Sequence, residues 1–416
     1  MNTAMSRKIV SISLLIPTLT LLLLCATGCN KGGDALATKN SSPIWKTEGR
    51  ANPATQTQPF VDRSEGIERR IHDVGLAMER NELGKVSDIL AGLLDDAPED
   101  LEIQALVAHA HWVKGRYERA HEWAGGVLKG LSPYVKANPD DLRARVALSR
   151  ARMVMGDIIG AEVQLRVAIR KGHRDPIALT AWADLLLKRN NVNSQEELID
   201  TAFVKEARES KPLACASHGQ LLIALGRLNQ AETLLNMCAE HVQNEKNNHL
   251  VKSRIHVVKG LLAIRQGDLQ KAMRIFKSAL EISEDDIDAR HNLALILYRK
   301  GQPEEALELL KQGDPYPNPE FFFLKATILE FIGDTASSVD ALNIALEHIE
   351  LWGQDFSTRW KVPFLLGRLL ARKGQYGRAQ QVLEQSLNLE PDPEGHDEIL
   401  RYLVWVRQKS SKPRSK

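Results

Sequence analysis

Apolar residues recur at helical spacing, every three to four positions, along most of the chain from about Ile67 onward. Leu, Ala, Glu, Gln, Lys and Arg dominate, and all of them favour helices. Runs of Val, Ile, Thr and aromatic residues with strict alternation, which would indicate strands, are absent from the sequence. The pattern therefore predicts an all-α fold without a sheet.

The helical pattern is also repeated. A clear unit near the C-terminus has small or apolar residues at Gly367, Ala379 and Leu383, with Gly374 between its two predicted helices. A Gly or Asn favours the tight reversal after a helix because it tolerates the left-handed backbone conformation. Aligned on this residue, nine units have their turns at Asn81, Gly115, Gly156, Asn190, Gly226, Gly267, Gly301, Gly333 and Gly374, at intervals of 34, 41, 34, 36, 41, 34, 32 and 41 residues.

This series resembles the tetratricopeptide repeat, in which small residues at positions 8, 20 and 27 let two antiparallel helices touch. The resemblance implies a right-handed superhelical solenoid of about nine helical hairpins over residues 67–393. The intervals of 41 residues predict longer helices or longer loops between repeats. Residues 394–408 carry Ile399, Leu400, Leu403 and Val404 at helical spacing, and we expect them to form a helix that caps the solenoid.

The N-terminus has the three parts of a secretory signal. Arg7 and Lys8 precede an apolar stretch at 9–24, and small residues lead to Cys29. This end resembles the lipobox of bacterial lipoproteins, which implies that residues 1–28 are removed and that Cys29 is lipidated. The implied location is extracytoplasmic, on a bacterial membrane, with the periplasmic face of the outer membrane favoured. An uncleaved membrane anchor is the alternative.

Two segments have compositions typical of flexible chains. Residues 29–66 follow the lipidated cysteine and are rich in Gly, Ser, Thr, Asn, Gln and Pro, so we expect a tether. Residues 409–416 combine Lys, Arg, Ser and Pro, which predicts a disordered basic tail.

Charge restricts the class of partner. Removing Arg7 and Lys8 with the signal leaves 53 of the 55 Lys and Arg residues, against 53 Asp and Glu. A mature chain without net charge gives no global reason to bind nucleic acid or an anionic membrane surface. We therefore expect no nucleic-acid partner, and contact with the membrane only through the acyl chains.

In the repeat family, positions 2, 5, 9, 12 and 13 of each first helix line a concave groove. Guanidinium groups there suit the carboxylates of an acidic peptide, a chain terminus or a uronate polysaccharide. An ordinary solvated surface is the alternative, because acidic residues such as Asp184, Asp288 and Glu330 occupy the same positions in nearly equal number. Arg143 and Arg150 are basic groove positions of the third repeat, and the residues that we predict to contact a ligand are Arg254, Arg265, His291, Tyr298, Arg299, Lys361, Arg368 and Arg372.

Cys215 and Cys238 occupy positions 4 and 27 of the fifth repeat, which face each other across an antiparallel hairpin. An oxidising compartment would permit a disulfide between them. The alternative is a pair of small buried thiols that fill the helix contact.

Motifs that carry chemistry are missing from the sequence. It contains no phosphate-binding GxxxxGK[ST], no GxSxG and no HExxH. His109 and His111 are two residues apart on a predicted helix and would point away from each other, which disfavours a shared metal. We predict no catalytic residue, metal, cofactor or small-molecule substrate.

These observations favour a membrane-anchored interaction scaffold over an enzyme. The resemblance to repeat lipoproteins implies a role in assembling a secretion, pilus or exopolysaccharide-export machine, with proteins or an anionic polymer of the cell envelope as partners. The alternative is an adaptor that recruits envelope enzymes such as peptidoglycan hydrolases.

Overall fold

The structure of the protein is a computed structural model. It describes residues 59–60, 64–79, 83–113, 116–189, 191–208, 212–243, 249–284, 286–311, 319–352, 359–389 and 391–410. The predicted signal, Cys29 and most of the tether lie outside the described residues, as do the turn residues Asn81, Gly115 and Asn190.

The described residues form α-helices, one short 3-10 helix and no strands, which confirms the predicted all-α fold. In chain order the α-helices are α1 Glu65–Glu79, α2 Leu83–Asp96, α3 Leu101–Val113, α4 Tyr117–Ala137, α5 Leu142–Val154, α6 Ile158–Arg170, α7 Pro176–Lys188, α8 Glu196–Arg208, α9 Pro212–Ala224, α10 Leu228–Gln243, α11 His249–Arg265, α12 Leu269–Ile282, α13 Ile287–Arg299, α14 Pro303–Lys311, α15 Pro319–Phe331, α16 Thr335–Trp352, α17 Lys361–Arg372, α18 Tyr376–Asn388 and α19 Pro393–Ser410.

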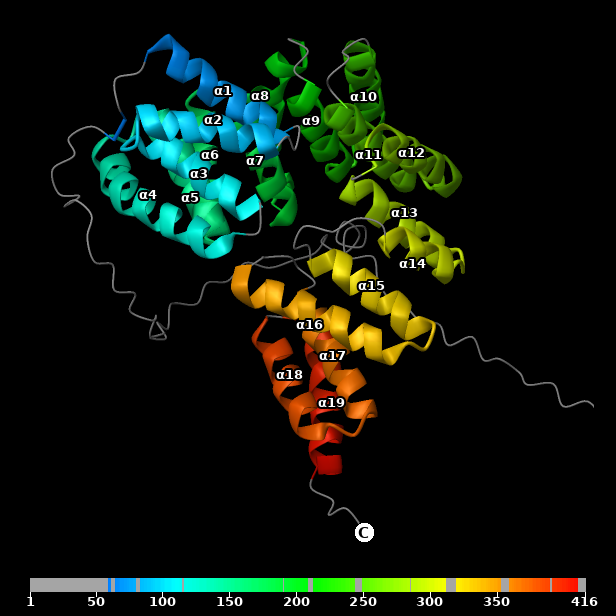
Figure 1. Ribbon diagram of the computed structural model, residues 1–416. Coiled ribbons are helices and arrows are strands. Elements are labelled where there is room, and N and C mark those ends of the chain that lie inside the picture. The colour runs from blue at the N-terminus through cyan, green and yellow to red at the C-terminus, as the bar shows by residue number, and fades with distance from the viewer. Residues whose placement is uncertain are drawn as a thin grey trace, which may run out of the picture. The chain divides into compact units, whose positions relative to one another are not determined.

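The helices pair along the chain into hairpins, from α1 with α2 to α17 with α18, and each hairpin packs on its neighbour (Figure 1). We call the odd-numbered member of a pair the first helix and the even-numbered member the second. Contacts join several consecutive first helices directly, including α3 with α5 and α9 with α11. Nine hairpins are described, followed by α19, so the predicted number of repeats is confirmed in the described part of the chain.

The turn between the two helices of a hairpin is left-handed wherever it is described. The positive backbone dihedral angle φ is the one that L-residues with a side chain rarely adopt, and Gly adopts it freely. This explains the choice of residue at the predicted turns, whose φ angles are 76° at Gly156, 75° at Gly226, 84° at Gly267, 79° at Gly301, 90° at Gly333 and 75° at Gly374.

Small residues bring the two helices of a hairpin into contact. A Cβ atom added to Gly260 on α11 would lie 2.5 Å from the ring of Phe276 on α12. Gly367 on α17 has the same relation to Leu383 on α18, where the distance would be 2.6 Å. On the second helices, the small residues Ala272, Ala306 and Ala379 are fully buried. The helices therefore approach so closely that a methyl group is excluded.

Aspartate starts many of the helices. A side chain that accepts from a backbone N–H in the first turn satisfies a donor that has no partner within the helix. Asp141, Asp175 and Asp286 accept in this way from the residue three positions on, at 2.9 Å in each case. These caps fix where the first helices of three repeats begin.

The intervals of 41 residues correspond to long helices. α4 has 21 residues, α11 has 17 and α16 has 18. The extra residues therefore lengthen helices of these hairpins, which was one of the two predicted explanations; the other was longer loops between repeats. Parts of the accompanying loops, at 244–248 and 353–358, lie outside the described residues.

The last helix differs in detail from the prediction. α19 runs from Pro393 to Ser410, so it includes two residues that the composition assigns to the tail. Ile399 and Leu403 are buried against α18, as expected of a capping helix, and Val406 is buried with them. The predicted positions Leu400 and Val404 are instead 41% and 54% exposed, because only one stripe of the helix faces the repeats.

The end of the expected tether packs on the repeats. The backbone N–H of Leu101 donates to the carbonyl oxygen of Pro59 at 3.1 Å, at the start of α3. The ring of Phe60 lies edge-on to Tyr134, with 6.3 Å between centroids, and 5.0 Å from the guanidinium carbon of Arg143. Residues 59 and 60 are therefore attached to the second and third repeats.

The described helices include none that combines the length and the apolar character needed to cross a membrane.

Replacement of Gly260 by Ala tests the close approach of the helices. We expect Gly260→Ala to lower the free energy of unfolding by about 1–3 kcal/mol relative to Gly377→Ala, because the added methyl must displace the buried ring of Phe276. Gly377 is the matched control, since it is also helical but has no atom within 4 Å of the added Cβ. Urea unfolding followed by circular dichroism measures both. Equal stability of the two variants would contradict the packing.

Candidate functional site

The first helices of the hairpins carry the predicted groove positions, and we call the surface that they present the first-helix face. It comprises the predicted groove positions on α1, α3, α5, α7, α9, α11, α13, α15 and α17. Direct contacts between consecutive first helices bring these positions within reach of one another. The ligand contacts predicted from the sequence lie on this face.

Several arginines on this face are paired with carboxylates of another first helix. Arg143 on α5 donates to Glu102 on α3 at 2.6 Å and to Glu68 on α1 at 2.8 Å. Arg254 on α11 donates to Asp184 on α7 at 3.1 Å. The face therefore carries ion pairs that connect different repeats.

The C-terminal part of the face has the same arrangement. Glu330 near the end of α15 accepts from Arg368 at 3.2 Å and from Arg372 at 2.8 Å, both on α17. The side chains of Arg368 and Glu330 are only 17% and 19% exposed, which protects this pair from screening by water. Three of the predicted ligand contacts, Arg254, Arg368 and Arg372, thus form ion pairs within the chain, and the last two share one carboxylate.

The other predicted basic residues differ in their surroundings. Arg265 is half-buried and forms no ion pair with a described residue. Arg299 lies at the end of α13, where partial burial lowers the pKa of its guanidinium although much of the residue is exposed. The ammonium nitrogen of Lys361 lies 5.3 Å from the centre of the Trp360 ring, and burial lowers its pKa. Arg265 and Lys361 therefore add cationic character to the C-terminal half of the face.

His291 and Tyr298 lie on α13, among apolar neighbours. Burial lowers the pKa of His291 to about 4, so its ring is neutral at pH 7. Tyr298 packs edge-on against Phe331, with 5.5 Å between ring centroids. Phe331 is 61% exposed and was not among the predicted contact residues, although its position 13 on α15 is a groove position. An exposed aromatic of this size suits contact with another polypeptide.

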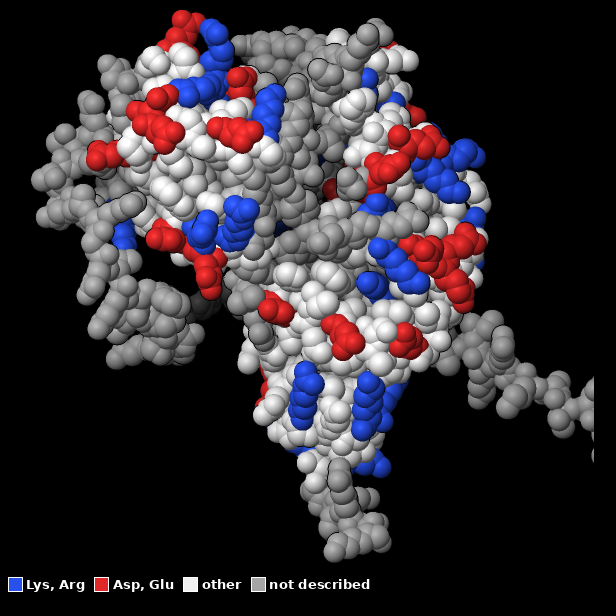
Figure 2. Space-filling model, viewed as in Figure 1, with Lys and Arg blue, Asp and Glu red and all other residues white. Residues whose placement is uncertain are grey.

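Charges of both signs are interspersed on the surface. In the view of Figure 2, basic and acidic side chains occur together over the N-terminal, middle and C-terminal helices. On the first-helix face, burial and the nearby Asp286 raise the pKa of Asp288, and burial raises the pKa of Glu320. Carboxylates therefore accompany the arginines, which agrees with the near balance found in the sequence.

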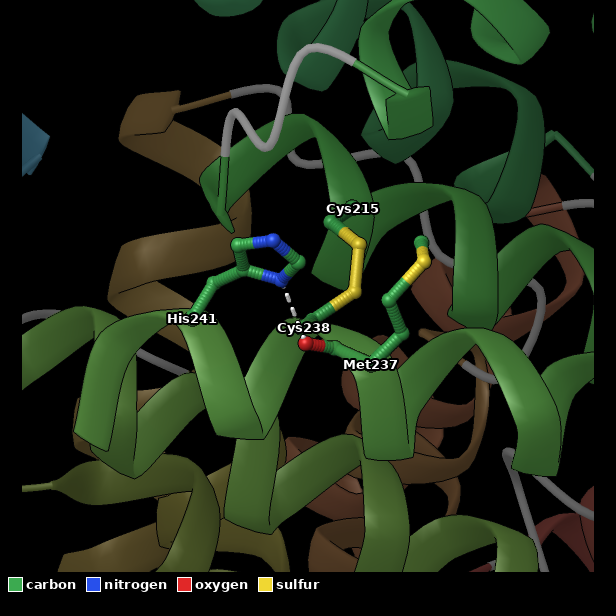
Figure 3. The surroundings of a disulfide bond; sticks show 4 residues. All are labelled: Cys215, Met237, Cys238 and His241. Carbon is green, nitrogen blue, oxygen red and sulfur yellow. Dashed lines mark hydrogen bonds between the residues drawn. A yellow bond between two sulfur atoms is a disulfide. The ribbon is translucent and has the colours of Figure 1, made fainter.

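A disulfide joins Cys215 on α9 to Cys238 on α10, with 6.3 Å between the Cα atoms (Figure 3). Both cysteines are 2% exposed. The ring of the nearby His241 is hydrogen-bonded through Nδ1 to the carbonyl oxygen of Met237 at 2.7 Å. The bond connects the two helices of the fifth hairpin at the positions predicted to face each other.

Among the residues that the structure describes, no three His, Cys, Asp or Glu side chains are grouped so that they could hold a metal ion. The first-helix face carries ion pairs such as Arg254 with Asp184 and an exposed aromatic side chain, Phe331.

Comparison with known families agrees with this geometry. Models of the tetratricopeptide repeat match residues 213–285, 263–321 and 364–396. In these segments the chain therefore carries tetratricopeptide repeats, a type of repeat that is typical of protein-interaction scaffolds.

Curated relatives match part of the chain. DnaJ homolog subfamily C member 3 of Homo sapiens is 24% identical over 268 residues, which are 60% of this chain and 52% of the relative. Tetratricopeptide repeat protein 37 of Xenopus laevis is 24% identical over 234 residues, 54% of this chain and 14% of the relative. The chain thus spans about half the length of the first relative and a smaller part of the second.

Solved structures with a similar arrangement of helices include yeast Tom70 and a chain of the APC/C hetero-tetramer Cut9–Hcn1. Tom70 is 13% identical with a TM-score of 0.48, covering 83% of this chain and 89% of its own. The Cut9–Hcn1 chain is 14% identical with a TM-score of 0.47, covering 82% and 57%.

Replacement of Glu330 tests whether the ion pairs stabilise the stack of repeats. We expect Glu330→Gln to lower the free energy of unfolding by about 1–3 kcal/mol, because it removes the negative charge that is paired with the largely buried guanidinium of Arg368. Glu308→Gln is the control, since Glu308 forms only an exposed pair with Lys311 and should change stability by less than about 0.5 kcal/mol. Urea unfolding of both variants decides the matter, and equal effects would contradict a structural role for the buried pair.

The disulfide predicts a measurable dependence on redox conditions. Protein purified without reductant should contain no free thiol at Cys215 or Cys238 by mass spectrometry after alkylation. Reduction should lower the free energy of unfolding by about 2–4 kcal/mol, because the unfolded chain regains freedom. Cys215→Ala combined with Cys238→Ala is the control, which reductant should not destabilise further. Two alkylated thiols in the untreated protein would contradict the bond.

Proposed function

We propose that this protein is an extracytoplasmic scaffold that is lipid-anchored to a bacterial membrane, with the periplasmic face of the outer membrane favoured, and that its first-helix face binds proteins of the cell envelope. The observation that carries the proposal is the combination of a lipobox-like N-terminus with tetratricopeptide repeats in one chain. Lipidation of Cys29 would confine the repeats to the membrane surface. The residues between Cys29 and Pro59 would give the repeats reach.

The charge arrangement favours a protein over an anionic polymer as the partner. A polymer of uniform negative charge requires a surface with an excess of unpaired cations. Here Arg143, Arg254 and Arg368 are already paired with carboxylates of the same face. Paired charges and an exposed aromatic side chain such as Phe331 suit a polypeptide, which presents charges of both signs and apolar groups.

The disulfide supports an extracytoplasmic location. Disulfides form and persist in oxidising compartments, whereas the cytosol keeps thiols reduced. The bond between Cys215 and Cys238 links two buried residues within one hairpin, where it would serve stability. A secreted scaffold would benefit from such a cross-link.

The biological role that we favour is assembly of a secretion, pilus or exopolysaccharide-export machine. A scaffold of this kind holds subunits close to the membrane while they assemble. Recruitment of envelope enzymes such as peptidoglycan hydrolases is the alternative, and it requires the same anchor and the same face.

Replacement of Cys29 tests the anchor. In bacterial cells, wild-type protein should be recovered with membranes and should incorporate a labelled fatty acid, and Cys29→Ala should lose both properties. Cys25→Ala is the matched control, because Cys25 belongs to the segment expected to be removed, and it should behave like the wild type. Membrane association and label retained by Cys29→Ala would overturn lipid anchoring.

Purification of the same three proteins from detergent-solubilised membranes tests the partner. Subunits of a channel or polymerase recovered with the wild type would support assembly, and hydrolases would support recruitment. Their loss from Cys29→Ala alone would show that the anchor brings scaffold and partner together. Recovery of no envelope protein with the wild type would contradict the proposed function.

A further inference from the structure

The capping helix α19 exposes more apolar side chains than any other helix that the structure describes. Nine large apolar side chains in the described part of the chain are at least 39% exposed, and three of them, Leu400, Val404 and Trp405, lie on α19. Each of the other described helices carries at most one. Isolated exposed apolar residues are ordinary on a protein surface, but several together indicate a contact surface.

These three residues, which we call the α19 patch, lie on the part of the helix that faces away from the repeats. The opposite side is buried against α18 through Ile399 and Leu403. Leu400 and Val404 are four residues apart, so they are neighbours on the helix surface, and Trp405 follows Val404 directly. A helix that ends a solenoid normally has a polar outer side, because that side remains in water. The patch departs from this rule.

The ring of Trp405 is held in place by other aromatic rings. Its centroid lies 6.2 Å from that of Tyr376 on α18 and 6.2 Å from that of Tyr402 on α19, edge-on in both cases. Tyr402 in turn lies edge-on to Phe364 of α17, at 5.6 Å. A side chain that is fixed before binding loses little conformational freedom when a partner covers it. Trp405 is therefore pre-organised for a contact between proteins, where Trp is enriched among the residues that dominate binding.

Charges along α19 are separated by sign. The acidic residues of the helix all precede Leu400, the basic residues all follow it, and every one of them is exposed. The acidic residues are Glu394, Asp397 and Glu398, and the basic residues are Arg401, Arg407 and Lys409. This order suits the helix dipole. Together with the apolar patch between the two groups, it also describes a surface that is complementary to itself.

A second copy of α19 matches this surface when the two helices run antiparallel. The acidic turns of each copy then lie beside the basic turns of the other, whereas a parallel pair would bring like charges together. The α19 patch lies near the middle of the helix, so the apolar residues of both copies meet at the centre of the pair. A two-fold axis relates such helices, and it is the commonest symmetry of protein oligomers.

We propose that the protein forms a homodimer in which the α19 helices of two copies pack antiparallel through Leu400, Val404 and Trp405. The contact covers the apolar residues that the capping helix leaves in water and pairs its opposite charges across the two-fold axis. This inference goes beyond the proposed function, because it concerns the end of the repeats and not the first-helix face. A dimer presents two such faces, which strengthens binding to a partner that has repeated subunits.

Sedimentation equilibrium of the full chain tests the dimer. The protein is purified in a detergent whose density matches that of the buffer, with micelles in excess over protein, so that only the protein mass is measured and acyl chains do not bring copies together. Over a concentration series that ends at about 100 µM, we expect the wild type to change from the mass of one copy to the mass of two.

Val404→Asp is the test variant for the apolar contact. It places a carboxylate in the middle of the patch, which should weaken the dimer at least about tenfold. Ile159→Asp is the matched control, since Ile159 lies on α6 and is 59% exposed, against 54% for Val404. Its replacement should leave the dissociation constant of the dimer unchanged.

Two charge variants test the antiparallel arrangement. Asp397→Lys combined with Glu398→Lys makes α19 basic along its length, and Arg401→Glu combined with Lys409→Glu makes it mainly acidic. Arg407 is left unchanged because it is paired with Glu384 of α18 at 2.8 Å. Each variant alone should dimerise at least about tenfold more weakly than the wild type, because like charges then oppose each other. An equimolar mixture should form mixed dimers, which would also show that both variants are folded.

Three results would overturn the inference. The first is a wild type that remains a single copy throughout the concentration series. The second is an equal dissociation constant for the wild type and Val404→Asp, which would place the contact between copies elsewhere. The third is a pair of charge variants that are helical by circular dichroism but do not dimerise when mixed. Each of these results leaves the first-helix face and its partner unaffected.

Discussion

Close contact between the two helices of each hairpin is the constraint on which the rest of this structure depends. Gly260 against Phe276 and Gly367 against Leu383 leave no room for one more carbon atom. Because the two helices of a hairpin lie so close together, the hairpin can stack on the next one and bury its apolar side there. The left-handed glycine turns, such as Gly267, serve the same end by reversing the chain without an extended loop. A larger residue at these positions would separate the helices and disturb the stack.

Stacking brings the first helices together and so creates the surface that we propose to be functional. Side chains far apart in the sequence meet there, such as Arg254 with Asp184 and Arg372 with Glu330. These pairs reduce the net charge of the face and connect neighbouring repeats. Arg150 is buried on the same face and forms no hydrogen bond or ion pair with another residue that the structure describes. The ion pairs therefore join repeats that are far apart in the sequence.

The sequence alone predicted most of the fold. Gly156, Gly226 and Gly301 could be placed at turns because a left-handed backbone leaves few alternatives to glycine. Small residues such as Ala306 could be placed between helices because their period follows that of the hairpin. Both signals are local or periodic, so they can be recognised without knowing which repeats touch.

The candidate site was less predictable. Whether Arg254 and Arg368 are paired depends on contacts between repeats, which the position within a repeat does not reveal. The isolation of Arg150 depends on burial and on the competing partner that Glu102 has found in Arg143. On α19, Leu400 and Leu403 share helical spacing with the apolar stripe, yet only the second faces the repeats. Such distinctions need three-dimensional contacts.

Site-specific photo-cross-linking tests the central claim, that the first-helix face binds a polypeptide. A photo-reactive amino acid at Phe331, an exposed residue of α15, is compared in intact cells with one at Ile344, an exposed residue of the second helix α16. We predict a discrete cross-linked protein from position 331 and none from position 344. A partner captured from position 344 but not from position 331 would contradict the account.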